Sequence, residues 1–236
     1  MKRLLRFSLG LTLVLAVAAG IFAGWLSATR VNARDLPKLK SGDIVFQIAG
    51  STQSKAISLA SHSLYTHVGI VEVTRDGRTQ VIEAAGPVHA TPIEPWIERG
   101  ASGRITVKRV KGLTEADAAK AVRAAHAYDG TPYDIFFYKS HDAIYCSELI
   151  HLAFKEGPGI AIGKDERVKD LNIGNAAVRA LIEARWRQHP ACIAAKAESF
   201  KACYPLILQQ TLVTPASVAR DDKLETVYTN FGLAAD

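Results

Sequence analysis

The sequence of 236 residues predicts an α+β fold in which a small antiparallel β-sheet packs against helices. Two β-rich segments are separated by an Asp-Gly turn signal, which indicates a hairpin. An alanine-rich segment and a later segment that begins near Cys146 indicate helices. The hydrophobic fraction of 48% and the charged fraction of 22% are typical of a globular chain, so a disordered protein is excluded.

The net charge of +6 comes largely from the start of the chain. Lys2, Arg3, Arg6 and Arg30 flank the first apolar run. Without residues 1–30, 25 of the 29 basic residues remain against 23 acidic residues, which is a net charge of +2. A polyanion-binding protein would carry its basic residues on the folded part of the chain. We therefore expect no nucleic-acid partner.

The first 30 residues have the layout of an export signal, with a basic start and an apolar stretch from Phe7 to Leu26. Cleavage could follow the small residues Ala16-Val-Ala18. Alternatively, residues 4–26 could stay as a membrane anchor, since about 20 apolar residues span a bilayer. The basic start stays in the cytoplasm and places the rest outside. The sequence thus predicts a periplasmic or extracellular protein, either released or anchored in the inner membrane.

The remaining chain divides into a linker at 31–40 and one domain at 41–236. Four segments rich in β-branched residues indicate strands: 42–47, 66–73, 79–84 and 105–110. Four further segments indicate helices: 54–60, 114–129, 145–155 and 175–187. Thr114-Glu-Ala-Asp117 is typical of a capping box at a helix start. The part from about 156 to 210 is expected to be helical and closed by a disulfide, and 211–217 to be extended.

The three cysteines suit an oxidising compartment. Cys192 and Cys203 bracket a short segment that a disulfide would close, which stabilises a fold by about 2–4 kcal/mol. The alternative is two unpaired, small apolar side chains. The disulfide would leave Cys146 as the odd thiol of an exported chain, and this calls for a functional explanation.

Cys146 lies in the first turn of a predicted helix, where unpaired N–H groups and the helix dipole stabilise a thiolate. The backbone N–H groups of Cys146 and Ser147 would also face a developing oxyanion. His67, at the start of a predicted strand, can exchange a proton with the thiol, and Glu83 on the next strand can orient the imidazole. Each of the three could instead be structural: a core cysteine, a core or edge histidine, and a surface acid.

The spacing of His67 and Glu83 sets a condition on the hairpin between them. Opposed residues of an antiparallel hairpin have numbers with a constant sum, and direct opposition of these two requires 150. The turn is then centred on Arg75. Loops of three or five residues satisfy this condition: Thr74–Asp76 or Val73–Gly77. A two-residue Asp76-Gly77 turn gives 153 and puts Glu83 on the other face, so we expect one of the longer loops or a bulge.

A metal centre is the main chemical alternative. The residues of suitable type are His62, His67, His89, His141 and Cys146. No pair of them has the compact spacing of zinc ligands on one element. We expect neither a metal nor another cofactor.

Five short motifs follow one another in the order of a known family. They are Ser41-Gly-Asp-Ile-Val-Phe46, Tyr65-Thr-His-Val-Gly-Ile70, Val81-Ile-Glu-Ala84, Tyr128-Asp-Gly-Thr-Pro-Tyr-Asp134 and Tyr145-Cys-Ser-Glu-Leu149. With a tail at Val213-Thr-Pro215, they make the chain from about residue 40 to about 225 resemble the permuted NlpC/p60-like cysteine amidases, in the YiiX/YebB-like branch of the papain-like fold. The histidine and the acid precede the cysteine, as they do in that permuted branch.

The resemblance implies a circularly permuted papain-like fold, whose small antiparallel sheet or barrel packs against the cysteine helix. It implies that Cys146 is the nucleophile, His67 the general base and acid, and Glu83 the orienting group. Glu83 is the least specific of these, because some relatives have other polar residues there. Tyr65 and Tyr145 would line the pocket or donate to an oxyanion, unless they are core aromatics. Ser147 is a further oxyanion candidate or caps the helix.

The expected reaction is hydrolysis of an amide bond through an acyl-enzyme on Cys146. The expected partner is a peptide or another small amide, such as a fragment of peptidoglycan. Two alternatives stay open. The same three residues could transfer or release a lipid acyl group, or the fold could serve as a non-catalytic module that binds the cell wall or a ligand.

Overall fold

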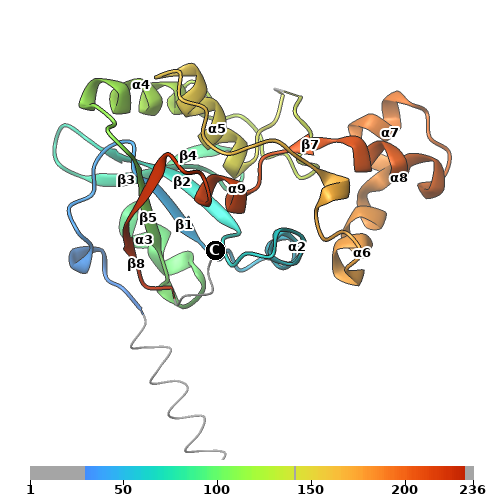
Figure 1. The fold of residues 1–236 in the computed structure, drawn as a ribbon, viewed down its shortest axis with the longest axis horizontal. Helices are drawn as coiled ribbons and strands as arrows, with labels where there is room; N and C mark the ends of the chain where they lie inside the picture. Colours follow the sequence, from blue (N-terminus) through green and yellow to red (C-terminus); the bar gives the residue numbers. More distant parts are fainter. Residues whose placement is uncertain (1–29, 141, 232–236) are drawn as a thin grey trace, which may run out of the picture.

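The computed structural model describes residues 30–140 and 142–231, so the predicted export segment lies outside the described residues, apart from Arg30 (Figure 1). The described chain is α+β, as predicted. Six strands form one antiparallel sheet in the order β4-β3-β2-β1-β5-β8. In this part of the chain the sheet is open, with β4 and β8 at its edges, and does not close into the barrel that was the other form of the prediction.

The strands of the sheet are β1 (Ile44–Gln47), β2 (His67–Val73), β3 (Thr79–Ala84), β4 (Val88–Pro92), β5 (Thr106–Val110) and β8 (Leu224–Thr229). A separate pair consists of β6 (Glu166–Arg167) and β7 (Thr211–Leu212). The helices are α2 (Thr52–Ser61), α3 (Ile93–Arg99), α4 (Glu115–His126), α5 (Cys146–Glu156), α6 (Ala176–Arg185), α7 (Pro190–Ala194), α8 (Phe200–Gln209) and α9 (Pro215–Ala219). Five of these elements were not predicted from the sequence: β4, β6, α3, α9 and β8. The extended segment expected at 211–217 is extended only at its start, because Thr214 caps the short helix α9 from Pro215 onward.

Both faces of the sheet are covered, which explains why its central strands are apolar on both sides. One face packs against α4 and α5 through a core that includes Phe46, Ile70, Leu149 and Phe154. The other face packs against α3, where Trp96 is fully buried among valines of β1, β2 and β3. Residues 31–40 run along this second face. The sheet therefore separates two layers, and α3 and α5 lie on different sides of it.

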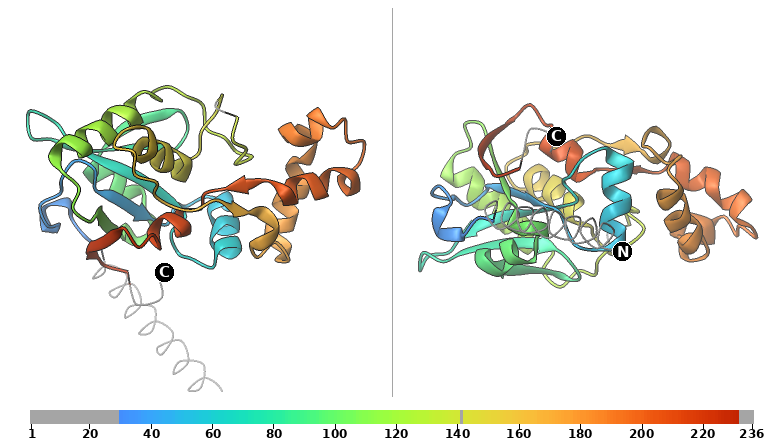
Figure 2. Two further views of the ribbon diagram at one scale, coloured as in Figure 1. Left: turned by 45° about the horizontal axis from the view of Figure 1, so that its top comes forward. Right: turned by 90° about the horizontal axis from the view of Figure 1, so that it is seen from below.

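A second group of helices stands away from the sheet at one end of the molecule, as Figures 1 and 2 show for α6, α7 and α8. We call residues 166–212 the helical unit. It has a small core of its own, built from Val168, Trp186, Ile207 and the two cysteines of a disulfide. That disulfide joins Cys192 in α7 to Cys203 in α8, with 5.2 Å between their Cα atoms, as predicted. No helix in the described residues is both long and apolar enough to span a bilayer.

The β2–β3 hairpin corrects the predicted register. Ile70 pairs with Ile82 and Val73 with Thr79, so the paired numbers sum to 152 rather than 150. The loop has five residues, as one form of the prediction required, but it runs over 74–78 and is centred one residue later than expected. Gly77 takes a φ of 82° and its N–H donates to the Thr74 carbonyl, so the glycine fixes where the loop closes.

Candidate active site

Cys146 and His67 are brought together by the start of a helix and the start of a strand. Cys146 is the first residue of α5, after an extended Tyr145, and it is a free, buried thiol. His67 is the first residue of β2 and is also buried. The thiol lies close enough to the imidazole to raise the pKa of His67. The cysteine and histidine expected from the sequence therefore meet in the folded chain.

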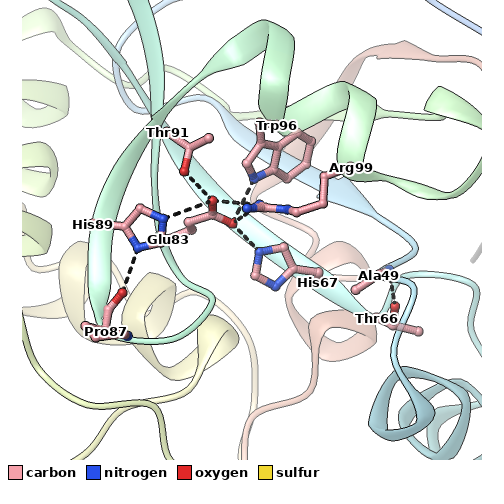
Figure 3. A network of polar contacts seen from close by, with 9 residues as sticks. All are labelled: Ala49, Thr66, His67, Glu83, Pro87, His89, Thr91, Trp96 and Arg99. Atoms are coloured by element: carbon pink, nitrogen blue, oxygen red, sulfur yellow. Dashed lines mark hydrogen bonds and ion pairs between the residues drawn. The ribbon is translucent and has the colours of Figure 1, made fainter.

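Glu83 approaches the same imidazole from the neighbouring strand. Its Oε2 lies 2.5 Å from Nε2 of His67 (Figure 3). Because Glu83 occupies Nε2, the Nδ1 atom is the ring nitrogen left to face the thiol. Continuing the observed register places Glu83 across from Gly69, two residues from His67 and on the same face of the sheet. The two side chains thus meet diagonally across the two strands. The predicted register had placed them directly opposite each other.

Three further groups hold Glu83, and all of them come from the unpredicted elements β4 and α3. The Thr91 hydroxyl donates to Oε1 at 2.7 Å, and the Trp96 indole N–H donates to Oε2 at 3.1 Å. Arg99 donates through Nη2 to both oxygens, each at 2.6 Å. The spacing of Ile93, Trp96 and Ile97, at positions i, i+3 and i+4, is the sequence signal that would have indicated this helix.

These contacts set the charges of the pair. Burial alone would lower the pKa of His67, but its hydrogen bonds with Cys146 and Glu83 outweigh burial and raise the pKa to about 9. Burial likewise would raise the pKa of Glu83, but the hydrogen bond and charge of His67, with the bonds from Arg99 and Thr91, lower it to about 2. At neutral pH the imidazole is therefore protonated and the carboxylate is ionised.

The structure places the remaining expected site residues at supporting positions. The Tyr65 hydroxyl hydrogen-bonds to Oγ1 of Thr106 at 2.9 Å, and its ring packs in the sheet core. The Tyr145 hydroxyl accepts from the N–H of Val213 at 3.0 Å, while Ser147 donates to the carbonyl of the same residue at 2.8 Å. Tyr145 and Ser147 thus hold the segment after β7 against the start of the cysteine helix.

An apolar pocket of about 130 Å³ opens beside Cys146. Its walls come from α2, from the loop at 135–137 and from the helical unit. Most of the lining side chains are aliphatic or aromatic, among them Ile57, Phe137, Val178, Ile182 and Ile207. Ser147 also lines it, but within the described chain neither Tyr65 nor Tyr145 does. The pocket was not predicted, because it forms between segments that are far apart in the sequence.

A sheet that supplies a histidine and an acid, facing a cysteine at the start of a later helix, defines the class of permuted papain-like proteins. The chain belongs to the permuted papain-like amidase family YaeF/YiiX, also called C92, whose model matches residues 38–228.

Two relatives from Escherichia coli support this assignment. The uncharacterized protein YiiX of strain K12 is 34% identical over 189 residues, which cover 80% of this chain and 85% of that protein. A crystal structure described as metalloprotein YiiX from strain O157:H7 has a TM-score of 0.71 and 34% identity. The match covers 80% of this chain and 97% of that one.

Because that relative is described as a metalloprotein, the residues of this chain can be compared with the ligands that a metal ion needs. Among the described residues, no three side chains of His, Cys, Asp or Glu gather into a cluster that could hold an ion. Both oxygens of Glu83 are already engaged by His67, Thr91, Trp96 and Arg99. Within the part of the chain that the structure describes, Glu83 thus has no oxygen left over for a metal ion.

Proposed function

We propose that this chain is an exported cysteine hydrolase that cleaves an amide bond through an acyl-enzyme on Cys146, and that the acyl part of its substrate is apolar. One observation carries the proposal: an apolar pocket opens on the sulfur of a cysteine that lies beside a buried histidine. Membership of an amidase family supports the reaction class. The disulfide is consistent with an exported protein.

In the first half of the reaction, the one proton of the pair is on His67, and the Sγ thiolate of Cys146 attacks the amide carbonyl carbon. The C=O electron pair moves onto oxygen. The N–H groups of the first turn of α5 have no partner within the helix, so they can stabilise this oxyanion. When the C–N bond breaks, His67 gives its Nδ1 proton to the leaving amine. A thioester between Cys146 and the acyl group results.

In the second half, the imidazole accepts a proton from water, and the resulting hydroxide attacks the thioester carbon. The C–S bond then breaks, and the acid and the free Cys146 sulfur are released. Glu83 keeps the ring in place throughout and stabilises the imidazolium, since it is ionised and bonded to Nε2. We assign it an orienting role.

The pocket indicates the substrate side. An apolar cavity of about 150 Å³ holds a benzene molecule, so a pocket of about 130 Å³ suits an aliphatic group of about six carbon atoms. The charged side chain of Arg185 at its wall is already bonded to the Ile135 carbonyl at 2.9 Å and to Gln53 at 2.8 Å. This lining favours an aliphatic acyl group over the polar peptide of a peptidoglycan fragment.

The same pocket also favours a second candidate, release or transfer of a lipid acyl group from an ester or thioester. Both reactions pass through an acyl group on Cys146, and they differ in the leaving group and in the final acceptor. Comparing turnover of a hexanoyl amide, a hexanoyl thioester and a hexanoyl ester separates them. Turnover of the amide with water as acceptor supports the first candidate, while turnover confined to the thioester or ester supports the second.

The test of the proposal is trapping of the acyl-enzyme. Purified full-length protein is mixed with hexanoyl p-nitroanilide and with a hexanoyl thioester, and its intact mass is followed. We expect a hexanoyl adduct on Cys146, none on Cys146→Ala, and slow formation on His67→Ala. Full activity of the Cys146→Ala variant would contradict the proposal. A Cys146 that alkylates no faster than a free thiol, with no adduct from any substrate, would point instead to a non-catalytic binding module.

A further inference from the structure

The loop at 135–137, which forms part of the pocket wall, has a restrained backbone. Asp134 accepts hydrogen bonds from the backbone N–H groups of Phe136, at 2.7 Å, and of Tyr138. Between them, Phe137 takes a φ of 54°, in the left-handed region that aromatic residues rarely adopt. Such a conformation persists only when its surroundings hold it in place. The loop therefore depends on contacts beyond its own residues.

Gln210, at the end of the helical unit, supplies those contacts. Its side-chain amide donates to the Phe136 carbonyl at 3.1 Å and to the Phe137 carbonyl at 2.5 Å. Its Oε1 accepts from Nε2 of His189 at 2.9 Å. The amide thus connects the helical unit to Phe136 and Phe137, which line the pocket together with Ile135, as Gln210 and His189 also do.

His189 fixes the direction of that amide. It is buried, its Nδ1 accepts from the Ala191 N–H at 3.3 Å, and burial lowers its pKa. A neutral imidazole with its proton on Nε2 can donate to Oε1 of Gln210, which turns the NH₂ group toward the loop carbonyls. The same ring packs edge-on against Phe136 and Tyr138, with centroids 5.6 and 5.7 Å away.

The loop in turn contacts the start of the cysteine helix. The ring of Phe137 packs edge-on against Tyr145, with 5.3 Å between centroids, and Tyr145 directly precedes Cys146. A continuous set of contacts therefore runs from the helical unit through the loop to the residue before the nucleophile.

We propose that Gln210 and His189 are positioning residues that hold the pocket wall beside Cys146 and thereby determine which acyl groups reach it. The inference rests on the proposed function, because it takes Cys146 as the acylated residue. Without the amide, the carbonyls of Phe136 and Phe137 lose their donor, and the left-handed conformation loses its restraint. The wall then moves, and the fit of a longer acyl chain suffers more than that of an acetyl group.

The experiment compares Gln210→Leu, which removes the amide with little change in size, with Gln209→Leu, at the exposed last residue of α8. For each folded variant, kcat and KM are measured with hexanoyl and acetyl p-nitroanilides or thioesters. In Gln210→Leu we expect the hexanoyl-to-acetyl ratio of kcat/KM to fall about tenfold, mainly through KM. In Gln209→Leu we expect the wild-type ratio. His189→Phe keeps the ring packing but not the donor, and should lower the ratio in the same direction.

Hydrogen exchange of the backbone amides at 135–138 gives a readout that does not need activity. It should be faster in Gln210→Leu than in Gln209→Leu. If both the exchange rates and the acyl ratio of Gln210→Leu and His189→Phe match the control, the positioning role is wrong. A wild-type protein that forms no acyl adduct at Cys146 overturns the proposed function and this inference together. An adduct with an unchanged ratio overturns only the inference.

Discussion

At the scale of residues, Glu83 is fully buried and yet ionised, because four side chains donate hydrogen bonds to it. An isolated carboxylate in that position would take up a proton, since burial penalises the charged form. The positive charges of His67 and Arg99 reverse this preference. The carboxylate in turn keeps the imidazole protonated and fixed in orientation, which is the state that proton donation to a leaving amine requires.

The pKa of His67 leads to a prediction for the pH profile. In the proposed reaction, acylation needs the protonated imidazole, so kcat/KM should fall as the pH rises through about 9, where His67 loses its proton. Glu83→Gln removes the negative charge that raises this pKa, so the alkaline fall should move to lower pH. The rate at neutral pH should also drop, by on the order of a hundredfold.

Glu72→Gln is the matched control for that variant. Glu72 lies on the same sheet and also contacts a histidine, His126, at 2.9 Å, but away from Cys146. We expect kcat/KM of Glu72→Gln to fall at the same alkaline pH as kcat/KM of the wild type. Coincident profiles for Glu83→Gln and the wild type would rule out an orienting role for Glu83.

At the scale of elements, the β2–β3 hairpin shows which local signals determine structure. The Asp76-Gly77 pair correctly indicated a hairpin, and Thr114 caps α4 as the capping-box pattern predicted, since its hydroxyl accepts from the Asp117 N–H at 3.1 Å. The predicted register paired each residue of β2 with a residue two positions before its observed partner in β3, because the loop was expected to be centred one residue too early. Loop length alone does not fix a register, because the position of the left-handed glycine within the loop also decides it.

Gly69 allows β2 and β3 to pack at this register. A Cβ at position 69 would lie 2.3 Å from Cγ1 of Val81 and 3.0 Å from the Ile82 carbonyl oxygen. Gly69→Ala should therefore lower the free energy of unfolding by about 1–3 kcal/mol, the usual cost of overpacking. Urea denaturation measures this. Gly50→Ala is the control, because a Cβ there meets no atom within 4 Å. Equal stabilities of the two variants would show that the close approach at Gly69 is relieved without cost.

At the scale of the whole molecule, the pocket exists only because the helical unit stands beside the six-stranded sheet and its helices. The sheet, α3 and α5 are enough to bring Cys146, His67 and Glu83 together. The wall of the pocket also needs α6, α8 and the loop at 135–137. The proposed chemistry and the proposed choice of acyl group thus belong to different parts of the fold.

The disulfide provides a test of this division. Replacing both Cys192 and Cys203 by alanine removes a crosslink worth about 2–4 kcal/mol from the core of the helical unit. Limited proteolysis should then cut within 166–212 faster than in the wild type. The six-stranded sheet and the helices packed on it should stay resistant to the protease. Cys146→Ala removes the third cysteine outside the unit and should leave the cleavage pattern unchanged. The same cleavage rate in the double variant and in the wild type would contradict a stabilising role for the disulfide.

The sequence by itself determined the features that local chemistry decides. Caps, apolar periodicity and a turn glycine specified the main strands and helices. The position of Cys146 at a helix start and of His67 at a strand start followed from the same signals. The pairing of Cys192 with Cys203 was favoured by the short segment between them, and the structure decided it against two unpaired cysteines.

Only the tertiary structure decided the surroundings of these residues. Thr91, Trp96 and Arg99 hold Glu83 through β4 and α3, two short elements with weak local signals. The apolar pocket and the contact of Gln210 with the loop at 136–137 join segments that are more than seventy residues apart. Such contacts depend on how distant surfaces pack, and this packing has no periodic trace in the sequence.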